Sequence, residues 1–291
     1  MNEFSITETA YTGFRIVRER PWALAYWALL NLIVDPPVNQ AAAPMFAALQ
    51  TAMTGAGKSP DQLMAALKPA WPMLLGAFAV SLVINATVSA AMNRAVLRPQ
   101  EDRFGYLRLG MDELRQLGLA LAMAGLSFAL VVAVTAVVVG LSALAGGDAN
   151  AAQAIAMLIL IGVGITLGVR LSMASALTFD SQKIDLFHAW QLTRGRFWRL
   201  AGTYLLALAM TSCVIILTGL VARAGVALAS GGVDAIAQVA DPNVASWHAL
   251  FTPARLIFFL LSAISTALTW PVFMTPPAAA YASLVQRSRY V

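Results

Sequence analysis

Long apolar segments alternate with short charged segments along this chain. Five stretches contain no Asp, Glu, Lys or Arg: Pro69–Asn93, Gln116–Gly147, Ala149–Val169, Leu200–Ala222 and Leu256–Gln286. An uncharged apolar stretch of about 18 residues or more is long enough to cross the bilayer as a helix. A helix is also the form in which a single segment satisfies its own backbone groups in lipid. The pattern therefore predicts five membrane spans and no β-sheet.

A sixth apolar segment, Pro21–Val34, is shorter and ends at Asp35-Pro36-Pro37. It needs flanking turns or a locally thinned bilayer to cross. We count it as a span, so the sequence predicts an all-α, polytopic membrane protein with six transmembrane helices arranged as three hairpins. The predicted spans of this single 1–291 membrane domain are 21–38, 72–94, 116–145, 151–178, 198–223 and 253–285.

The positions of Lys and Arg predict the orientation of the chain. Basic residues in short loops are retained on the cytoplasmic side of a membrane. With the N-terminus inside, only Lys58, Lys68, Arg223 and Arg255 of the 19 basic residues fall in outer segments. Both termini are therefore expected in the cytoplasm, and the protein is expected in a bacterial inner membrane.

Composition agrees with this interpretation and narrows the possible partners. The chain is 59% hydrophobic and 11% charged, with a mean hydropathy of +0.74, whereas about a quarter of the residues of a soluble domain are charged. The net charge of +5 fits attraction to anionic headgroups of the cytoplasmic leaflet. Nucleic acid is not an expected partner. Cys213 is the single cysteine, which excludes a disulfide framework and a thiolate metal cluster.

Residues 1–20 are expected to be structural rather than a secretory signal, since they carry Glu3, Glu8 and Glu19 and lack an apolar core. A capping box at Ser5–Glu8 and an apolar face predict an interfacial amphipathic helix. Each hairpin is expected to open with such a basic, aromatic surface helix. Phe14–Leu24 and Trp190–Leu200 share an aromatic residue, two arginines, a tryptophan and a leucine at the same offsets, and 104–119 is a looser copy. Duplication and the ordinary enrichment of these residue types at membrane interfaces both explain the pattern.

Candidate binding residues lie in the second predicted span. Polar residues recur there at intervals of four: Ser81, Asn85, Ser89 and Asn93. This spacing places them on one helical face. They serve either as interhelical hydrogen-bonding groups, worth about 0.6 kcal/mol per contact, or as a polar wall along the path of a solute or lipid headgroup. We name Asn85, Ser89 and Asn93 as candidate binding residues.

Arg170 is the fourth candidate binding residue, because it interrupts an apolar run from Ala151 to Phe179. A charged residue inside a membrane segment is a functional-site hypothesis by default. Arginine also snorkels toward the membrane surface. Arg170 is therefore either a structural anchor or a contact for an anionic headgroup or carboxylate.

The sequence offers little for catalysis. His188 and His248 are predicted on opposite sides of the membrane, so they do not form one metal site, and Cys213 lies in an apolar span where a thiol is usually inert. The pairs Glu101-Asp102 and Asp112-Glu113 are cytoplasmic, either solvated or paired with arginines. We expect no catalytic residues, no metal and no cofactor, and a protein that is not an enzyme.

Two short motifs resemble a known family. Ala189–Thr193 followed by Gly195–Leu200 resembles the signature of bacterial six-helix inner-membrane proteins, which include the membrane domain of some glycerophosphodiester phosphodiesterases. Pro277 followed by Ala280–Leu284 and Arg287 is similar to the end of their last helix. The resemblance implies a six-helix membrane module concerned with lipid or envelope homeostasis. No catalytic domain with histidine and acidic metal ligands is present, so hydrolysis is not implied.

Two functions are consistent with these features. The protein accommodates or transports a lipid headgroup or small amphiphile through a polar bundle interior, with Arg170 as the anionic contact. The alternative is a membrane scaffold or partner-binding subunit without transport activity. Expected partners are membrane lipids and their anionic headgroups, with a protein partner or a homo-oligomer as further possibilities.

Overall fold

The computed structural model describes residues 5–53, 65, 68–145, 149–230, 232 and 252–288. In these ranges the chain contains helices and no strand, which confirms the all-α class. The elements are α1 (Ile6–Ala10), α2 (Thr12–Glu19), α3 (Pro21–Met53), η1 (Lys68–Ala70), α5 (Trp71–Leu97), η2 (Arg103–Tyr106), α6 (Met111–Ala145), α7 (Ala149–Leu171), α8 (Ala174–Ser181), α9 (Leu186–Leu192), α10 (Phe197–Ser230) and α12 (Pro253–Ser288).

Five helical segments in the described ranges are long and apolar enough to cross a membrane: α5, α6, α7 together with α8, α10 and α12. The protein is therefore a polytopic membrane protein by the length and composition of its helices. The first predicted span, in α3, does not belong to this set, because Asn31, Asp35 and two prolines lower its mean hydropathy. α3 nevertheless remains helical for 33 residues and continues through Asp35-Pro36-Pro37 to Met53.

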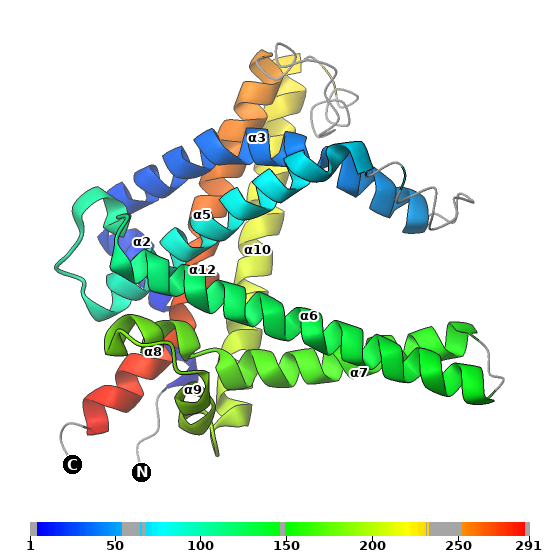
Figure 1. The fold of residues 1–291 in the computed structure, drawn as a ribbon. Coiled ribbons are helices and arrows are strands. Elements are labelled where there is room, and N and C mark those ends of the chain that lie inside the picture. Colours follow the sequence, from blue (N-terminus) through cyan, green and yellow to red (C-terminus); the bar gives the residue numbers. More distant parts are fainter. Residues whose placement is uncertain are drawn as a thin grey trace.

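The long helices form three hairpins, α3 with α5, α6 with α7, and α10 with α12 (Figure 1). α1 and the C-terminal end of α12 lie at one end of the molecule, together with η2, α8 and α9, and the three hairpins diverge from this end. We call this end the hub, defined as α1, α2, η2, α8, α9 and the adjoining ends of the long helices. The hub therefore fixes where each hairpin starts.

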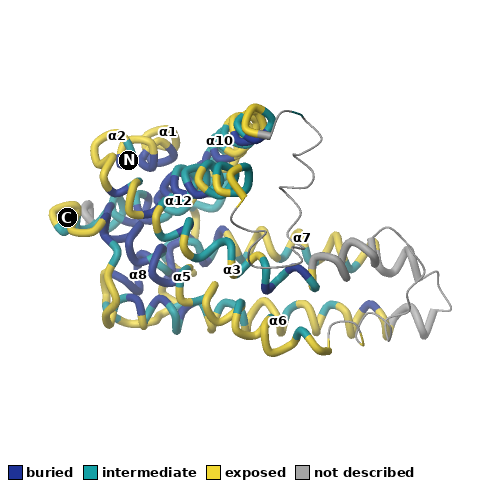
Figure 2. The backbone as a smooth tube through the Cα atoms, turned by 90° about the horizontal axis from the view of Figure 1, so that it is seen from above, coloured by how far each residue is buried: buried dark blue, intermediate teal, exposed yellow. Residues whose placement is uncertain are grey.

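Most of the buried residues lie at the hub, whereas the α6–α7 hairpin extends away from it and is largely exposed (Figure 2). One buried cluster is centred on Met173, Leu200 and Tyr281. A second is centred on Trp27 and Met92. Large apolar side chains are exposed along α6, α7 and α10, for example Phe128, Leu158 and Leu205, as on a helix surface that contacts lipid.

The N-terminal helices α1 and α2 lie at the surface of the protein, and each also packs against a long helix. Ser5 caps α1 as predicted, since its Oγ accepts a hydrogen bond from the Glu8 backbone nitrogen at 3.4 Å. The buried face of α2 packs on α12, and α1 packs on α10. Gly13 makes the approach to α12 possible, because a Cβ there would lie 2.5 Å from Val272 Cα and closer still to the Pro271 carbonyl oxygen.

The surface helix predicted over 104–119 is wrong in its first part. Phe104, Gly105 and Tyr106 have positive φ angles of 52°, 63° and 66°, so residues before α6 form a tight turn and α6 begins at Met111. The turn is held against α3 by the Trp27 indole, whose Nε1 donates to the Gly105 carbonyl oxygen at 2.8 Å. Gly105 lies so close to α3 that a Cβ there would be 3.0 Å from Ala23 Cα. A regular helix would not present this carbonyl to Trp27.

Replacing Gly13 with alanine is expected to lower the free energy of unfolding by about 1–3 kcal/mol, the usual cost of overpacking a tight contact. The added methyl group meets the backbone of α12, which moves only with the helix. Thermal unfolding of the purified protein in detergent measures the effect. Gly76→Ala is the matched control, because Gly76 is also helical and a Cβ there meets nothing within 4 Å. Equal stability of the two variants would show that α2 does not dock on α12.

Candidate functional site

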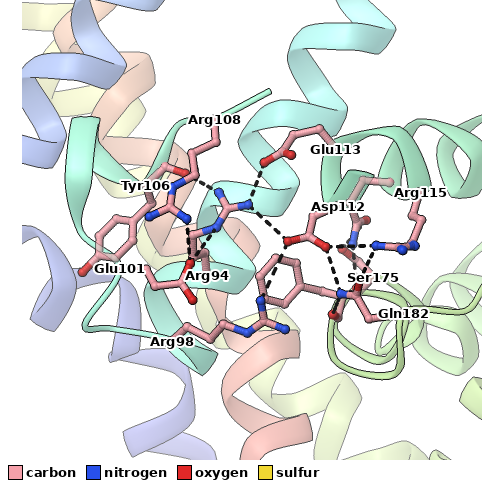
Figure 3. A network of polar contacts seen from close by, with 12 residues as sticks. Arg94, Arg98, Glu101, Tyr106, Arg108, Asp112, Glu113, Arg115, Ser175 and Gln182 are labelled. Carbon is pink, nitrogen blue, oxygen red and sulfur yellow. Dashed lines mark hydrogen bonds and ion pairs between the residues drawn. The ribbon is translucent and has the colours of Figure 1, made fainter. Parts of the chain in front are cut away.

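The most deeply buried charge at the hub is Arg94, whose side chain is 2% exposed in the last turns of α5. Its Nη2 donates to Glu113 Oε1 at 2.8 Å, and its Nη1 donates to the Tyr106 carbonyl oxygen (Figure 3). Glu113 and Asp112 belong to the first turn of α6, where the helix dipole favours acidic side chains, while arginine is favoured at the C-terminal end of α5. A buried charge of this kind is tolerated because it is paired.

The charges around Arg94 compensate one another. Arg98 Nη1 lies 3.8 Å from Asp112 Oδ2, and its guanidinium lies 4.8 Å from the centre of the Phe179 ring. Glu101 accepts a hydrogen bond from Arg108 at 2.8 Å. The acidic pairs Glu101-Asp102 and Asp112-Glu113 are therefore paired with arginines, which was one of the two interpretations of the sequence. This arrangement supports α5, η2 and α6 and leaves no free cation for a ligand within the network drawn in Figure 3.

Two of the candidate binding residues, Ser89 and Asn93, meet at Ser175 of α8. Ser175 Oγ donates to Gln116 Oε1 at 3.0 Å and accepts from Asn93 Nδ2 at 2.7 Å. Its remaining acceptor site leaves Ser89 Oγ, 2.7 Å away, as the donor of their shared hydrogen bond. The hydroxyl of Ser175 is then fully used within the protein. The predicted spacing identified two members of this cluster but not Gln116 or Ser175, because their place opposite α5 is set by the packing of α6 and α8.

Asn85, the third candidate on this face, lines a separate pocket. The pocket has a volume of about 140 Å³ and lies between α3, α5 and α12. Its polar lining is Asn31 and Asp35 from α3, and Ser81 and Asn85 from α5, with the Trp270 side chain from α12. At 1.5 Å per residue, Asp35 lies roughly 21 Å along α3 from Pro21, and Asn85 roughly 18 Å along α5 from its hub end. Asp35 and Asn85 therefore lie at similar distances from the hub, each along its own helix.

The polar groups of this pocket are largely unpartnered. The Asp35 carboxylate and the side chains of Ser81 and Asn85 have no hydrogen bond or ion pair with any residue in the described ranges. Asn31 Nδ2 donates to the Trp27 carbonyl oxygen at 2.9 Å, which leaves the Asn31 Oδ1 as an acceptor. Ser81 and Asn85 are exposed. This pocket is our candidate functional site.

Sequence reasoning missed Asp35 because it treated this residue as the end of a span. A usable signal was present, since Asn31 and Asp35 are spaced by four residues in an apolar segment and so share a helical face. The spacing by four predicts Ser81 on the polar face of the second span but contains no information about the pocket that it lines.

Arg170 lies apart from the other three candidates and does not line the pocket. Its Nη1 donates to the Thr193 carbonyl oxygen at 3.1 Å, and Thr193 Oγ1 donates back to the Arg170 carbonyl oxygen at 3.0 Å. Its guanidinium lies 5.5 Å from the centre of the Trp190 ring and 5.7 Å from that of Phe197, within the range of cation–π attraction. These contacts join α7 to the turn between α9 and α10, as a structural anchor would. Binding of an anion by Arg170 stays a prediction.

The rest of the described chain offers no group of three or more His, Cys, Asp or Glu residues arranged to hold a metal ion. The chain matches no protein-family model, no curated protein and no solved structure. The resemblance to the six-helix inner-membrane proteins therefore stays a prediction, and the site has to be interpreted from its own residues.

Replacing Arg94 with methionine is expected to lower the free energy of unfolding by about 3–5 kcal/mol, because it leaves Glu113 as a buried charge without its partner. Arg108→Met is the control, since the Arg108–Glu101 pair is far more exposed and such a pair contributes at most about 1 kcal/mol. Denaturation of both variants in detergent gives the comparison. Adding Glu113→Leu to Arg94→Met should recover part of the loss; a double variant less stable than the single one would contradict this account.

Proposed function

We propose that this protein is a non-enzymatic, multi-pass protein of a bacterial inner membrane that accommodates a small amphiphile or lipid headgroup in the pocket between α3, α5 and α12. The observation that carries the proposal is the set of unpartnered polar side chains at this pocket, namely Asp35, Ser81 and Asn85. Such groups are costly in the bilayer unless something hydrogen-bonds to them. An occupant with polar atoms removes this cost.

The lining of the pocket favours an amphiphile over a purely polar solute. Val34, Ile84, Val88 and Met274 contribute apolar side chains beside the polar ones. A ligand with a polar head and a short hydrocarbon portion fits both kinds of lining. Asn85 keeps its predicted role in this proposal, whereas Ser89, Asn93 and Arg170 act through the hydrogen bonds that hold the hub together.

The membrane arrangement that we propose has six spans with both termini in the cytoplasm. α3 has 33 residues, enough to cross a bilayer even when tilted, and its contacts with α5 and α12 shelter part of its polar side. The arginine-rich connections, α1 and the C-terminal end of α12 belong to the hub, which the positive-inside rule assigns to the cytoplasmic side. Trp22 and Trp198, which are 80% and 84% exposed beside the hub, suit the membrane interface, where tryptophan is enriched.

A second candidate function is that of a scaffold. Phe187 and Leu109 are 74% and 83% exposed in the connections of the hub, close to basic residues such as Arg108 and Lys183 in the sequence. Exposed apolar side chains rimmed by charges are typical of surfaces that bind a protein or a membrane. This function requires no occupant in the pocket, and this difference separates the two candidates.

Native mass spectrometry of protein extracted with its membrane lipids tests the pocket. The wild type should retain a bound small molecule, and Asn85→Leu should bind it at least about ten-fold more weakly, because the change removes a polar partner and fills space; a ten-fold weakening corresponds to about 1.4 kcal/mol. Val80→Leu is the control, since Val80 lies on α5 but outside the pocket lining and is 45% exposed. Equal retention by Asn85→Leu and the wild type would contradict the proposal.

Cysteine labelling in a Cys213→Ala background tests the orientation. Leu109→Cys at the hub should react with a membrane-impermeant maleimide only in inside-out vesicles, and Leu228→Cys at the far end of α10 only in right-side-out vesicles. Both leucines are more than 80% exposed, so each position offers an accessible thiol. Labelling of both positions from the same side would rule out the proposed topology.

A further inference from the structure

The pocket between α3, α5 and α12 offers more hydrogen-bond acceptors than donors. An ionised Asp35 carboxylate is an acceptor only. Asn31 donates one of its two amide N–H groups to the Trp27 carbonyl oxygen, which leaves its Oδ1 as an acceptor beside one remaining donor. Ser81 and Asn85 can each supply one group of either kind. The pocket lining therefore carries a net negative charge and has more hydrogen-bond acceptors than donors.

No protein cation balances Asp35 within the described ranges. Ion pairs such as those of Arg20, Arg94 and Arg115 lie at the hub, and Asp35 forms none with a residue of the described ranges. A carboxylate within a membrane segment normally pairs with a positive group. Trp270 also lines the pocket, and the face of an indole ring attracts cations.

We infer that the ligand of this pocket carries a primary ammonium group and that Asp35 is its counter-ion. This inference rests on the proposed function and specifies the class of its ligand. A primary ammonium has three donors and no acceptor, which complements the carboxylate, the Asn31 oxygen and the polar groups of α5. A quaternary ammonium supplies charge without donors, and an alcohol supplies a donor without charge. The hydrocarbon portion of the ligand lies against Val34, Ile84 and Met274.

The test uses the full-length protein in nanodiscs of phosphatidylcholine and phosphatidylglycerol, which contain no primary amine. Calorimetric titrations compare n-butylammonium, n-butanol and tetramethylammonium. We expect n-butylammonium to bind at least about ten-fold more tightly than either of the others, since truncating one partner of a buried charge pair costs at least this much. Equal affinity for n-butanol would overturn the role of charge, and equal affinity for tetramethylammonium would overturn the role of the N–H donors.

Asp35→Asn keeps the size of the side chain and removes its charge, so it should weaken n-butylammonium binding by about ten-fold or more while leaving n-butanol binding unchanged. Glu19→Gln is the matched control at an exposed acidic residue of the hub and should change neither affinity. If Asp35→Asn does not fold, the comparison of the three probes on the wild type decides the question. If instead Asp35→Asn changes the oligomeric mass and not the affinity, a second copy of the chain covers the pocket and the inference is wrong.

The two proposals fail in different ways. If the wild type retains the co-purified molecule but does not prefer n-butylammonium over the other two probes, the ammonium inference is overturned. The pocket then remains an amphiphile site. Retention of that molecule by Asn85→Leu, with no binding of any probe, overturns both. Nanodiscs that contain phosphatidylethanolamine identify the source of the group: weaker n-butylammonium binding there means that a lipid headgroup competes for the pocket, and unchanged binding means that a free alkylamine is the ligand.

Discussion

The buried guanidinium of Arg94 is the interaction on which the arrangement of the hub depends. Its positive charge is tolerated only where Glu113 and the Tyr106 carbonyl oxygen reach it, so α5, the turn before α6, and α6 itself must come together. Trp27 then attaches α3 to the same turn through Gly105. The relative position of α3 and α5 is set in this way at the hub, and the polar pocket between them follows from it further along the two helices.

The features that local sequence determines could be predicted, and those that distant packing determines could not. The length and hydropathy of the uncharged stretches were enough to identify five helices able to span a membrane. Asp35-Pro36-Pro37 has the local signature of a helix end, yet α3 continues through it while packing on α5 and α12. The turn at 104–106 likewise depends on a hydrogen bond from Trp27, far away in the sequence, and no local pattern contains that information.

The same distinction applies to the candidate site. Spacing by four correctly placed Ser81, Asn85, Ser89 and Asn93 along one side of α5, but it says nothing of what lies opposite each residue. Ser89 and Asn93 face Ser175 and are satisfied by it, whereas Asn85 faces a pocket with a carboxylate on the other wall. One polar stripe therefore divides into a structural half and a candidate binding half, and only the neighbouring helices determine where the division falls.

The docking of α2 on α12 has a consequence for biosynthesis. Gly13 fits against the backbone at Pro271 and Val272, so α2, which is translated before the three hairpins, docks on α12, which is translated after the other long helices. The amphipathic segment must wait, held at the membrane surface by its apolar face, while the intervening hairpins insert. Final closure of the hub therefore follows the synthesis of α12, and a nascent chain stalled before α12 emerges would still have this segment undocked.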